Sequence, residues 1–211
     1  MIFDVGEMAP KSRYNLLASL IVPRPIAWIT TVDVRGLVNA APFSFFNLMS
    51  GTPPLVCIGI GAREGIPKDT ARNIGDTGEF VINLVDLESV ESMNITAGDY
   101  PAAVDETAVA GLELVASQSI APPRLARAPV SLECVEQQTL SIGYGRSIVV
   151  GEITTAHVDD EHVLDPSRGH IDGASLDLVG RMHGGGWYTT TSDPFRLARV
   201  DQPSVVFGSL K

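Results

Sequence analysis

The sequence predicts a mainly β protein with minor α-structure, in which antiparallel strands form a barrel or a sandwich. Two observations predict this class. Short apolar or alternating segments end at turn residues throughout a chain that holds 20 Gly and 14 Pro, and the helical patterns are few and brief. A doubly wound parallel sheet needs repeated strand–helix crossovers, which the sequence does not offer.

Composition and charge narrow the classes of protein further. The chain has 211 residues, of which 45% are hydrophobic and 19% are charged, so a disordered chain is excluded. This length, without an internal repeat or a low-complexity linker, predicts a single domain over residues 1–211. The formal net charge is −10 and no Lys/Arg cluster interrupts the acidic background, which argues against nucleic acid or a membrane as a partner.

Cysteine usage and the N-terminus both indicate a cytoplasmic protein. Cys57 and Cys134 each lie inside an apolar segment, which is typical of buried thiols in a reducing compartment. The N-terminus carries Asp4 and Glu7 and lacks the pattern of a secretory signal.

Hydrophobic periodicity and turn residues predict the elements in order. Residues 11–21 are expected to form a short helix, and residues 25–33 and 37–43 a hairpin that turns at Gly36. The nearly all-apolar residues 53–61 predict a strand that is buried on both faces.

The same signals continue through the second half of the chain. We expect a short helix over 68–78 stopped at Gly75 or Gly78, a strand over 79–85, a helix over 86–98 capped by Asp86, a loop-rich segment over 99–124, a long hairpin over 126–160 that turns at Gly143–Gly145, and an irregular last fifty residues.

One long segment carries no charge at all. From Gly36 to Ala62 there is no charged residue, yet Pro42, Pro53 and Pro54 prevent the run from forming a membrane-spanning helix. An uncharged, non-helical run of this length predicts a buried strand pair, or a surface that meets an apolar partner or ligand.

Two further patterns resemble known sites but lack the context that such sites need. Gly59 and Gly61 form a GxG after an apolar strand, but Pro67 interrupts the following segment and no further strand–helix–strand unit follows. On a strand, His157 and His162 point to opposite faces, so they are not expected to share a metal ion. No nucleophile motif of a hydrolase is present.

A small group of cations stands out in this acidic chain. Arg63, Lys68 and Arg72 lie close to Thr70, at the start of the helix predicted near Asp69. Backbone N–H groups at a helix start, a Lys and a hydroxyl together suit a phosphate dianion. The residues alone leave a second interpretation open, in which this is a solvated helix face with an Asp69–Arg72 pair.

Six segments then occur in a recognisable order. They are PRPIAW (23–28), NAAPFSFFN (39–47), PPLV (53–56), KDTARN (68–73), GEFVIN (78–83) and the glycine-rich RMHGGGWY (181–188). Their order and separations resemble the flavin reductase-like FMN-binding split-barrel proteins, close to the flavoredoxin branch. The resemblance covers residues 10–200.

This resemblance implies an antiparallel Greek-key split β-barrel, a homodimer, and one FMN per subunit near the dimer interface. It implies three groups of cofactor-binding residues: Arg24, Pro25, Ile26 and Thr30 along the flavin and ribityl chain; Ala41, Pro42, Phe43, Ser44 and Asn47 around the isoalloxazine edge; and Arg63, Lys68, Asp69 and Thr70 at the phosphate. No metal is expected.

The resemblance also implies an NAD(P)H-dependent FMN reductase, with NADH or NADPH as co-substrate and a monooxygenase or electron-transfer protein as partner. The alternative is a non-catalytic FMN-binding electron-transfer protein that another protein reduces. His183 is the candidate catalytic residue, because the glycines after it let the loop approach a flat ligand. Gly169-His170-Ile171-Asp172 differs by one extra residue from the Gly-His-Asp of short flavin reductases, so the choice between His170 and His183 stays open.

Overall fold

A seven-stranded antiparallel sheet forms the body of the protein in the computed structural model, which describes residues 1–101 and 103–197. In spatial order its strands are β3 (Val38–Phe43), β2 (Ala27–Val32), β8 (Glu79–Leu84), β11 (Val130–Gly143), β12 (Arg146–Val158), β5 (Pro54–Ile60) and β4 (Phe46–Gly51). Every neighbouring pair is antiparallel. The predicted mainly β, antiparallel class is confirmed.

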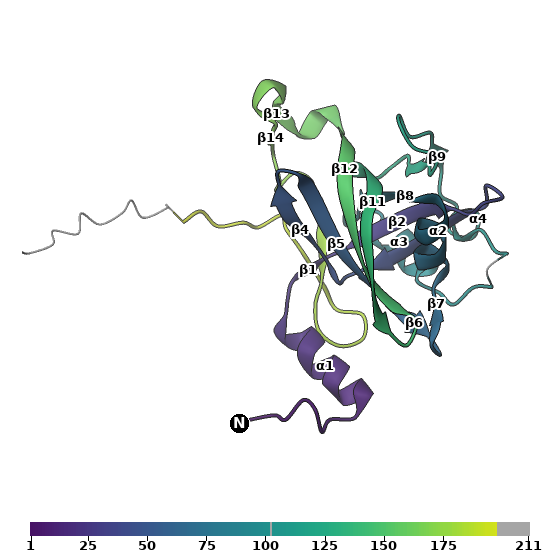
Figure 1. The fold of residues 1–211 in the computed structure, drawn as a ribbon. Coiled ribbons are helices and arrows are strands. Elements are labelled where there is room, and N and C mark those ends of the chain that lie inside the picture. The colour runs from purple at the N-terminus through teal and green to yellow at the C-terminus, as the bar shows by residue number, and fades with distance from the viewer. Residues whose placement is uncertain (102, 198–211) are drawn as a thin grey trace, which may run out of the picture.

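The sheet coils so strongly that the two halves of its strand order enclose one core (Figure 1). Strands β3 and β5 come into contact, although four other strands lie between them in the order of the sheet. Phe43 from β3, Ile58 from β5 and Phe80 from β8 are all buried in the same cluster. Apolar side chains from both halves of the sheet are therefore buried in a single core, as in an incompletely closed barrel.

Helices α2 (Asp69–Thr77), α3 (Val90–Thr96) and α4 (Glu106–Val109) pack near strands β2 and β3 (Figure 1). Gly78 ends α2 in the left-handed conformation, with φ of 74°, which a glycine adopts without strain. The Trp28 indole N–H donates to the hydroxyl of Thr96 at 2.9 Å and so joins β2 to α3. Helix α1 (Pro10–Leu20) lies away from this group, below the barrel.

Short elements complete the chain. They are β1 (Arg24–Pro25), β6 (Ala62–Arg63), β7 (Ile66–Pro67), β9 (Leu114–Val115), β10 (Arg124–Leu125), η1 (Asp160–His162), β13 (Val163–Asp165), η2 (Pro166–Arg168), β14 (His170–Ile171), β15 (Val179–Arg181) and β16 (Tyr188–Thr190). Strand β15 pairs with both β1 and β16, so the glycine-rich segment forms the tip of a hairpin beside the start of the barrel.

Most predicted elements occur, with three differences. The predicted helix over 86–98 forms only as α3, because the side chain of Asp86 accepts from the N–H of Ser89 and closes a turn before the helix. Strand β5 alternates between buried and half-buried residues, so it is not buried on both faces. Strand β4 was not predicted as a separate element; it pairs with β5 and forms one edge of the sheet.

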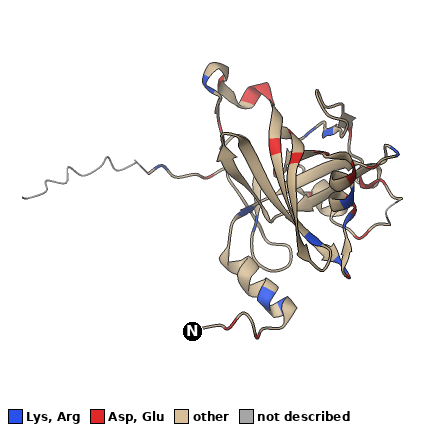
Figure 2. Cartoon of the chain, viewed as in Figure 1, with Lys and Arg blue, Asp and Glu red and all other residues tan. Residues whose placement is uncertain are grey.

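The uncharged segment of the sequence forms β3, β4 and β5, and β4 and β5 together make one edge of the sheet. Figure 2 shows no acidic or basic residue on these two strands, whereas charged residues occur along β11, β12 and the helices. In the described part of the chain, no helix is long and apolar enough to cross a membrane.

A buried carboxylate ties strand β12 and a surface loop to the middle of the sheet. Glu133 is fully buried; it accepts hydrogen bonds from the N–H of Gln118 at 2.6 Å and from Ser119 N–H and hydroxyl at 2.9 and 2.7 Å. It also lies 2.7 Å from Nε2 of His157. Burial by itself raises the pKa of Glu133, but these hydrogen bonds outweigh burial and lower the pKa to about 2.

We expect Glu133→Gln to lower the free energy of unfolding by about 3 kcal/mol at pH 7, because it removes a buried charge from donors that remain in place. The pKa of Glu133 lies below its ordinary value of 4.5, so its contribution is fully present above about pH 4.5 and is lost as the pH falls toward 2. Urea unfolding between pH 2 and 7 measures this loss. Glu136→Gln, on the same strand, is the control; equal stability of the two variants would contradict the assignment.

Candidate functional site

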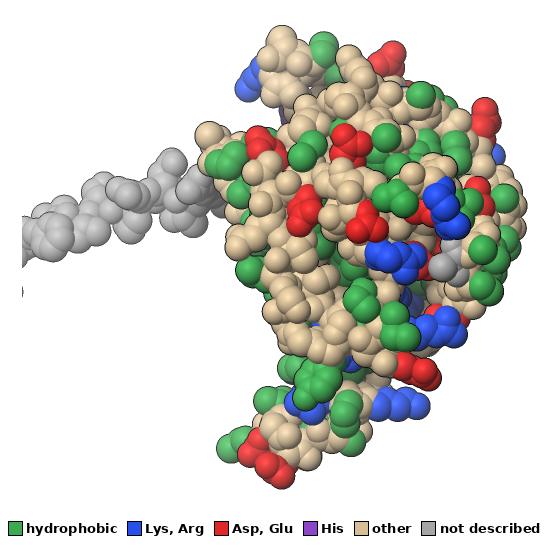
Figure 3. Space-filling view, turned by 45° about the vertical axis from the view of Figure 1, so that its right-hand side comes forward, with side chains coloured by type: hydrophobic (Ala, Val, Ile, Leu, Met, Phe, Trp, Pro, Cys, Tyr) green, Lys and Arg blue, Asp and Glu red, His purple; other side chains and the backbone are tan. Residues whose placement is uncertain are grey.

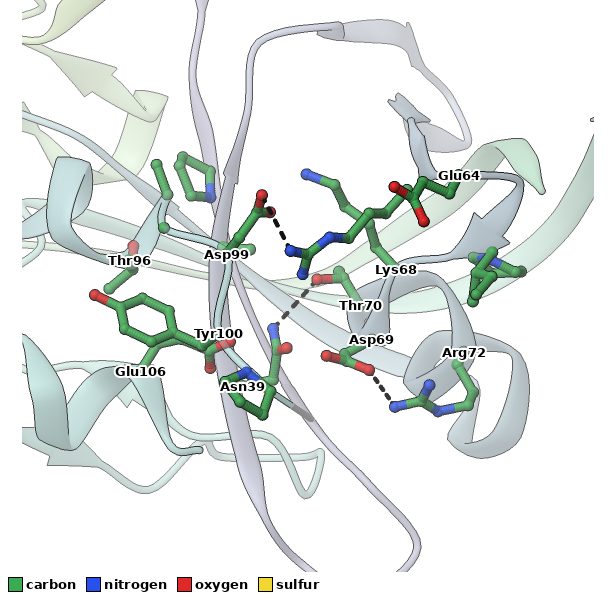
Figure 4. Close-up of a pocket in the computed structure, with 18 residues that line it drawn as sticks. Asn39, Glu64, Lys68, Asp69, Thr70, Arg72, Thr96, Asp99, Tyr100 and Glu106 are labelled. Atoms are coloured by element: carbon green, nitrogen blue, oxygen red, sulfur yellow. Dashed lines mark hydrogen bonds and ion pairs between the residues drawn. The ribbon is translucent and has the colours of Figure 1, made fainter. Parts of the chain in front are cut away.

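A polar cleft of about 580 Å³ opens at the start of helix α2 (Figures 3 and 4). Strand β3, the β6–β7 hairpin, the first turn of α2, the segment after α3 and the start of α4 form its walls. Its lining residues include Asn39, Ala41, Pro42, Arg63, Lys68, Asp69, Thr70, Tyr100 and Glu106. In the space-filling view, Lys and Arg side chains gather on this side of the molecule (Figure 3).

Two hydrogen bonds fix helix α2 against the edge of the sheet. The side-chain amide of Asn39 donates to the hydroxyl of Thr70 at 3.2 Å (Figure 4). The amide of Asn73 donates to the hydroxyl of Thr31 at 3.1 Å. All four residues are buried. The start of α2 is therefore held rigidly beside β3, where Asp69 and Thr70 line the cleft.

Hydrogen-bond donors without acceptors converge at this helix start. The first backbone hydrogen bond of α2 runs from Arg72 N–H to Lys68 C=O, so the N–H groups of Asp69, Thr70 and Ala71 have no acceptor among the described residues. The Thr70 hydroxyl accepts from Asn39 and keeps its own proton for a ligand. This donor set suits an anion with several oxygens.

Among the described residues, two of the three cations around the cleft are paired with carboxylates, and one is not. Arg72 pairs with Asp69, which neutralises the one carboxylate in the first turn of α2. Arg63 pairs with Asp99 across the cleft at 3.4 Å, and both side chains are largely exposed. Lys68 forms no ion pair within the described residues; its Nζ lies 5.5 Å from the centre of the Phe43 ring. Lys68 is therefore the cation most available to a ligand.

A second cleft, of about 480 Å³ and mainly apolar, lies on the other side of the barrel. Pro25, Ile26 and Asn47 line it, together with residues of β5 and β15. It shares no lining residue with the polar cleft. The predicted cofactor residues therefore divide between two clefts: Ala41, Pro42, Arg63, Lys68, Asp69 and Thr70 line the polar one.

Four other predicted residues line neither cleft: Arg24, Thr30, Phe43 and Ser44. Thr30 is fully buried, and its hydroxyl donates to Pro123 C=O at 2.5 Å. Phe43 belongs to the core, next to Lys68. Ser44 accepts from Nε of Arg24 at 3.4 Å.

Arg24, in β1, contacts two other segments of the chain. Its buried guanidinium donates to the carbonyls of Ala18 and Ile21 at the end of α1 and to that of Met182 in the glycine-rich hairpin. Burial lowers the pKa of Arg24 from its ordinary value, but an arginine stays charged at neutral pH. In this structure Arg24 thus holds α1 and the hairpin together.

The histidines have separate environments. His183 is exposed and stacks on Trp187, with ring centres 5.9 Å apart. His157 faces Glu133, and Nδ1 of His162 lies 2.7 Å from the Ser175 hydroxyl. Across residues 1–101 and 103–197, no three His, Cys, Asp or Glu side chains come together as a metal site.

Sequence reasoning did not predict Asn39, Tyr100 or Glu106 as site residues. Asn39 lies inside the NAAPFSFFN segment, so its position next to the predicted residues was a usable signal. Glu106 reaches the cleft from a segment with no motif, and only the fold brings it to Ala40.

The fold and the cleft define an antiparallel split-barrel protein with a polar cleft whose donors suit an anion. The model of the "Flavin reductase like domain" matches residues 19–174. The chain therefore belongs to the flavin reductase-like family, and it is a flavoprotein of the oxidoreductase kind.

Similar proteins agree with this assignment. An uncharacterized protein of Deinococcus radiodurans is 44% identical over 206 residues, covering 94% of this chain and 89% of its own. The structure of the 2-nitrobenzoate 2-nitroreductase NbaA of Pseudomonas fluorescens is 30% identical, with a TM-score of 0.87 over 99% of this chain and 100% of its own. Nitrilotriacetate monooxygenase component B of Bacillus cereus is 29% identical, with a TM-score of 0.87 over 93% of this chain and 98% of its own.

Proposed function

We propose that this chain is an NAD(P)H-dependent FMN reductase that holds FMN in the polar cleft. The observation that carries the proposal is the set of free donors at the start of α2, where Lys68, the Thr70 hydroxyl and backbone N–H groups face one cleft. A bound flavin supplies the hydride chemistry itself, and the protein supplies binding, orientation and electrostatics.

The phosphate group would lie at this helix start. The N–H groups of Thr70 and Ala71 and the Thr70 hydroxyl supply hydrogen bonds, and Lys68 supplies an unpaired positive charge. Arg72 pairs with the carboxylate of Asp69 and so weakens its repulsion of the anion. Ala41 and Pro42 continue the cleft wall along β3 and provide backbone and apolar contacts for the remainder of the cofactor.

Lys68→Met is expected to weaken FMN binding by roughly tenfold to a hundredfold, because a hydrogen bond to a charged group contributes about 1.5–3 kcal/mol. Riboflavin, which lacks the phosphate, should bind both proteins equally. Titration calorimetry with both ligands measures this, and Lys11→Met on α1 is the matched control. Equal affinity of the wild-type protein for FMN and riboflavin would contradict the phosphate site.

The catalytic role rests on family membership and on similar proteins. One similar protein is described as a nitroreductase and another as component B of a monooxygenase. We propose by analogy that this chain passes electrons to a separate acceptor, such as a monooxygenase. His183, exposed beside Gly184 in a hairpin tip, is the candidate for contact with the nicotinamide donor.

We expect the purified protein to oxidise NADH or NADPH with free FMN as acceptor, and His183→Ala to slow this oxidation while FMN affinity stays within about twofold. Absorbance of the nicotinamide measures the rate, and His162→Ala is the control, since His162 faces Ser175. The same slowing in His170→Ala but not in His183→Ala would assign the role to His170. No turnover with either nucleotide, despite tight FMN binding, would instead favour the electron-transfer protein that another protein reduces.

We further propose that the chain is a homodimer. Helix α1 and strand β4 present exposed apolar side chains, among them Leu17, Leu20, Leu48 and Met49. The mainly apolar second cleft lies beside β4, on the uncharged side of the barrel. Exposed apolar side chains that lie together on a protein surface are typical of an interface.

Sedimentation equilibrium at micromolar concentration tests the dimer. The expected mass is that of two chains, and Met49→Glu should shift the equilibrium toward single chains because it places a charge in the interface. Glu91→Gln on the exposed side of α3 should leave the mass unchanged. A single chain for the wild-type protein would contradict the dimer.

A further inference from the structure

A buried carboxylate in the polar cleft remains without a complete set of partners. Glu106 begins helix α4 and lines the cleft, although its side chain is only 7% exposed. One carboxylate oxygen accepts from Ala40 N–H at 3.3 Å. Within the described residues the only further donor to the carboxylate is the backbone N–H of Glu106 itself, and no cation pairs with it. Burying a carboxylate with so few donors is costly.

Covering the sheet edge does not require this charge. Ala40 lies on edge strand β3, and its outward N–H needs a single acceptor, which a neutral side chain would also provide. The environment opposes the charged form: burial, followed by the nearby charges of Asp69 and Asp105, raises the pKa of Glu106 above its ordinary value. A carboxylate kept under these conditions indicates a donor that arrives with a ligand.

The position of Glu106 indicates which part of the ligand carries that donor. Ala40, which donates to Glu106, directly follows Asn39, which donates to Thr70 at the anion-binding helix start. Glu106 and Thr70 line the same cleft, and the charge of Asp69 acts on the Glu106 carboxylate, so this carboxylate lies near the start of α2. In FMN the groups next to the phosphate are the ribityl hydroxyls, whereas the ring edges are further away.

We propose that Glu106 is a specificity-determining residue that accepts hydrogen bonds from the ribityl hydroxyls of the flavin. This inference rests on the proposed FMN site and extends it to the polyhydroxyl chain. Lys68 and Thr70 select for the phosphate, and Glu106 selects for the hydroxylated chain beside it. A flavin ring without that chain leaves the carboxylate buried and unsatisfied.

A ligand-by-variant cycle tests the proposal. The ligands are riboflavin and lumiflavin, which carries a methyl group in place of the ribityl chain, and both lack the phosphate that Glu106 would repel. Flavin fluorescence titration gives the affinities for the wild-type protein and for Glu106→Ala. We expect the preference for riboflavin over lumiflavin to fall roughly tenfold in Glu106→Ala. The matched control Glu91→Ala, on the exposed side of α3, should keep the wild-type preference.

Glu106→Gln separates binding from folding, because its amide oxygen can still accept from Ala40. We expect this variant to be at least as stable as the wild type at pH 7, since a raised folded-state pKa means that the charged form is a cost that grows as the pH rises. Its riboflavin preference should fall by a smaller factor than in Glu106→Ala.

The outcomes are distinguishable. The role of Glu106 is overturned if Glu106→Ala keeps the wild-type preference for riboflavin. It is also overturned if this variant loses affinity for riboflavin and lumiflavin by the same factor. In both cases the flavin site itself stands. Failure of the wild-type protein to bind any flavin overturns the proposed function itself.

Discussion

The hydrogen bond from Asn39 to Thr70 is the contact on which the polar cleft depends. It joins the edge strand β3 to the first turn of α2, and the second bond, from Asn73 to Thr31, prevents the helix from rotating away. Because both bonds are buried, they exchange little with water and hold the helix start in one place. The free N–H groups, Lys68 and Glu106 face the cleft as a consequence.

Electrostatics within this acidic chain are local. The net charge is −10, yet the helix start offers an unpaired Lys68 and keeps Asp69 paired with Arg72. The opposite requirement applies at Glu106, where a buried carboxylate has only backbone N–H groups as donors and needs more. An anion at one end and hydroxyl donors beside it satisfy both needs, so one nucleotide-like ligand accounts for the two features.

Local signals in the sequence predicted the hairpin of β11 and β12 and the helix α2, because turn residues and cap positions lie within a few residues of each other. Lys68 and Thr70 could be predicted as a site for the same reason. Glu106 could not, since its partner Ala40 lies 66 residues away and the segment around it carries no motif. Arg24 was predicted along the flavin, but its carbonyl partners in α1 and at Met182 are brought together only by the fold.

The location of the flavin phosphate is tested most directly by amide NMR of the full chain with FMN and with riboflavin. The account predicts that both ligands shift the amides of Ala40 and Ala41, and that only FMN shifts those of Thr70 and Ala71 strongly. Identical shifts with the two ligands, or shifts confined to residues of the apolar cleft such as Val56 and Val179, would contradict it.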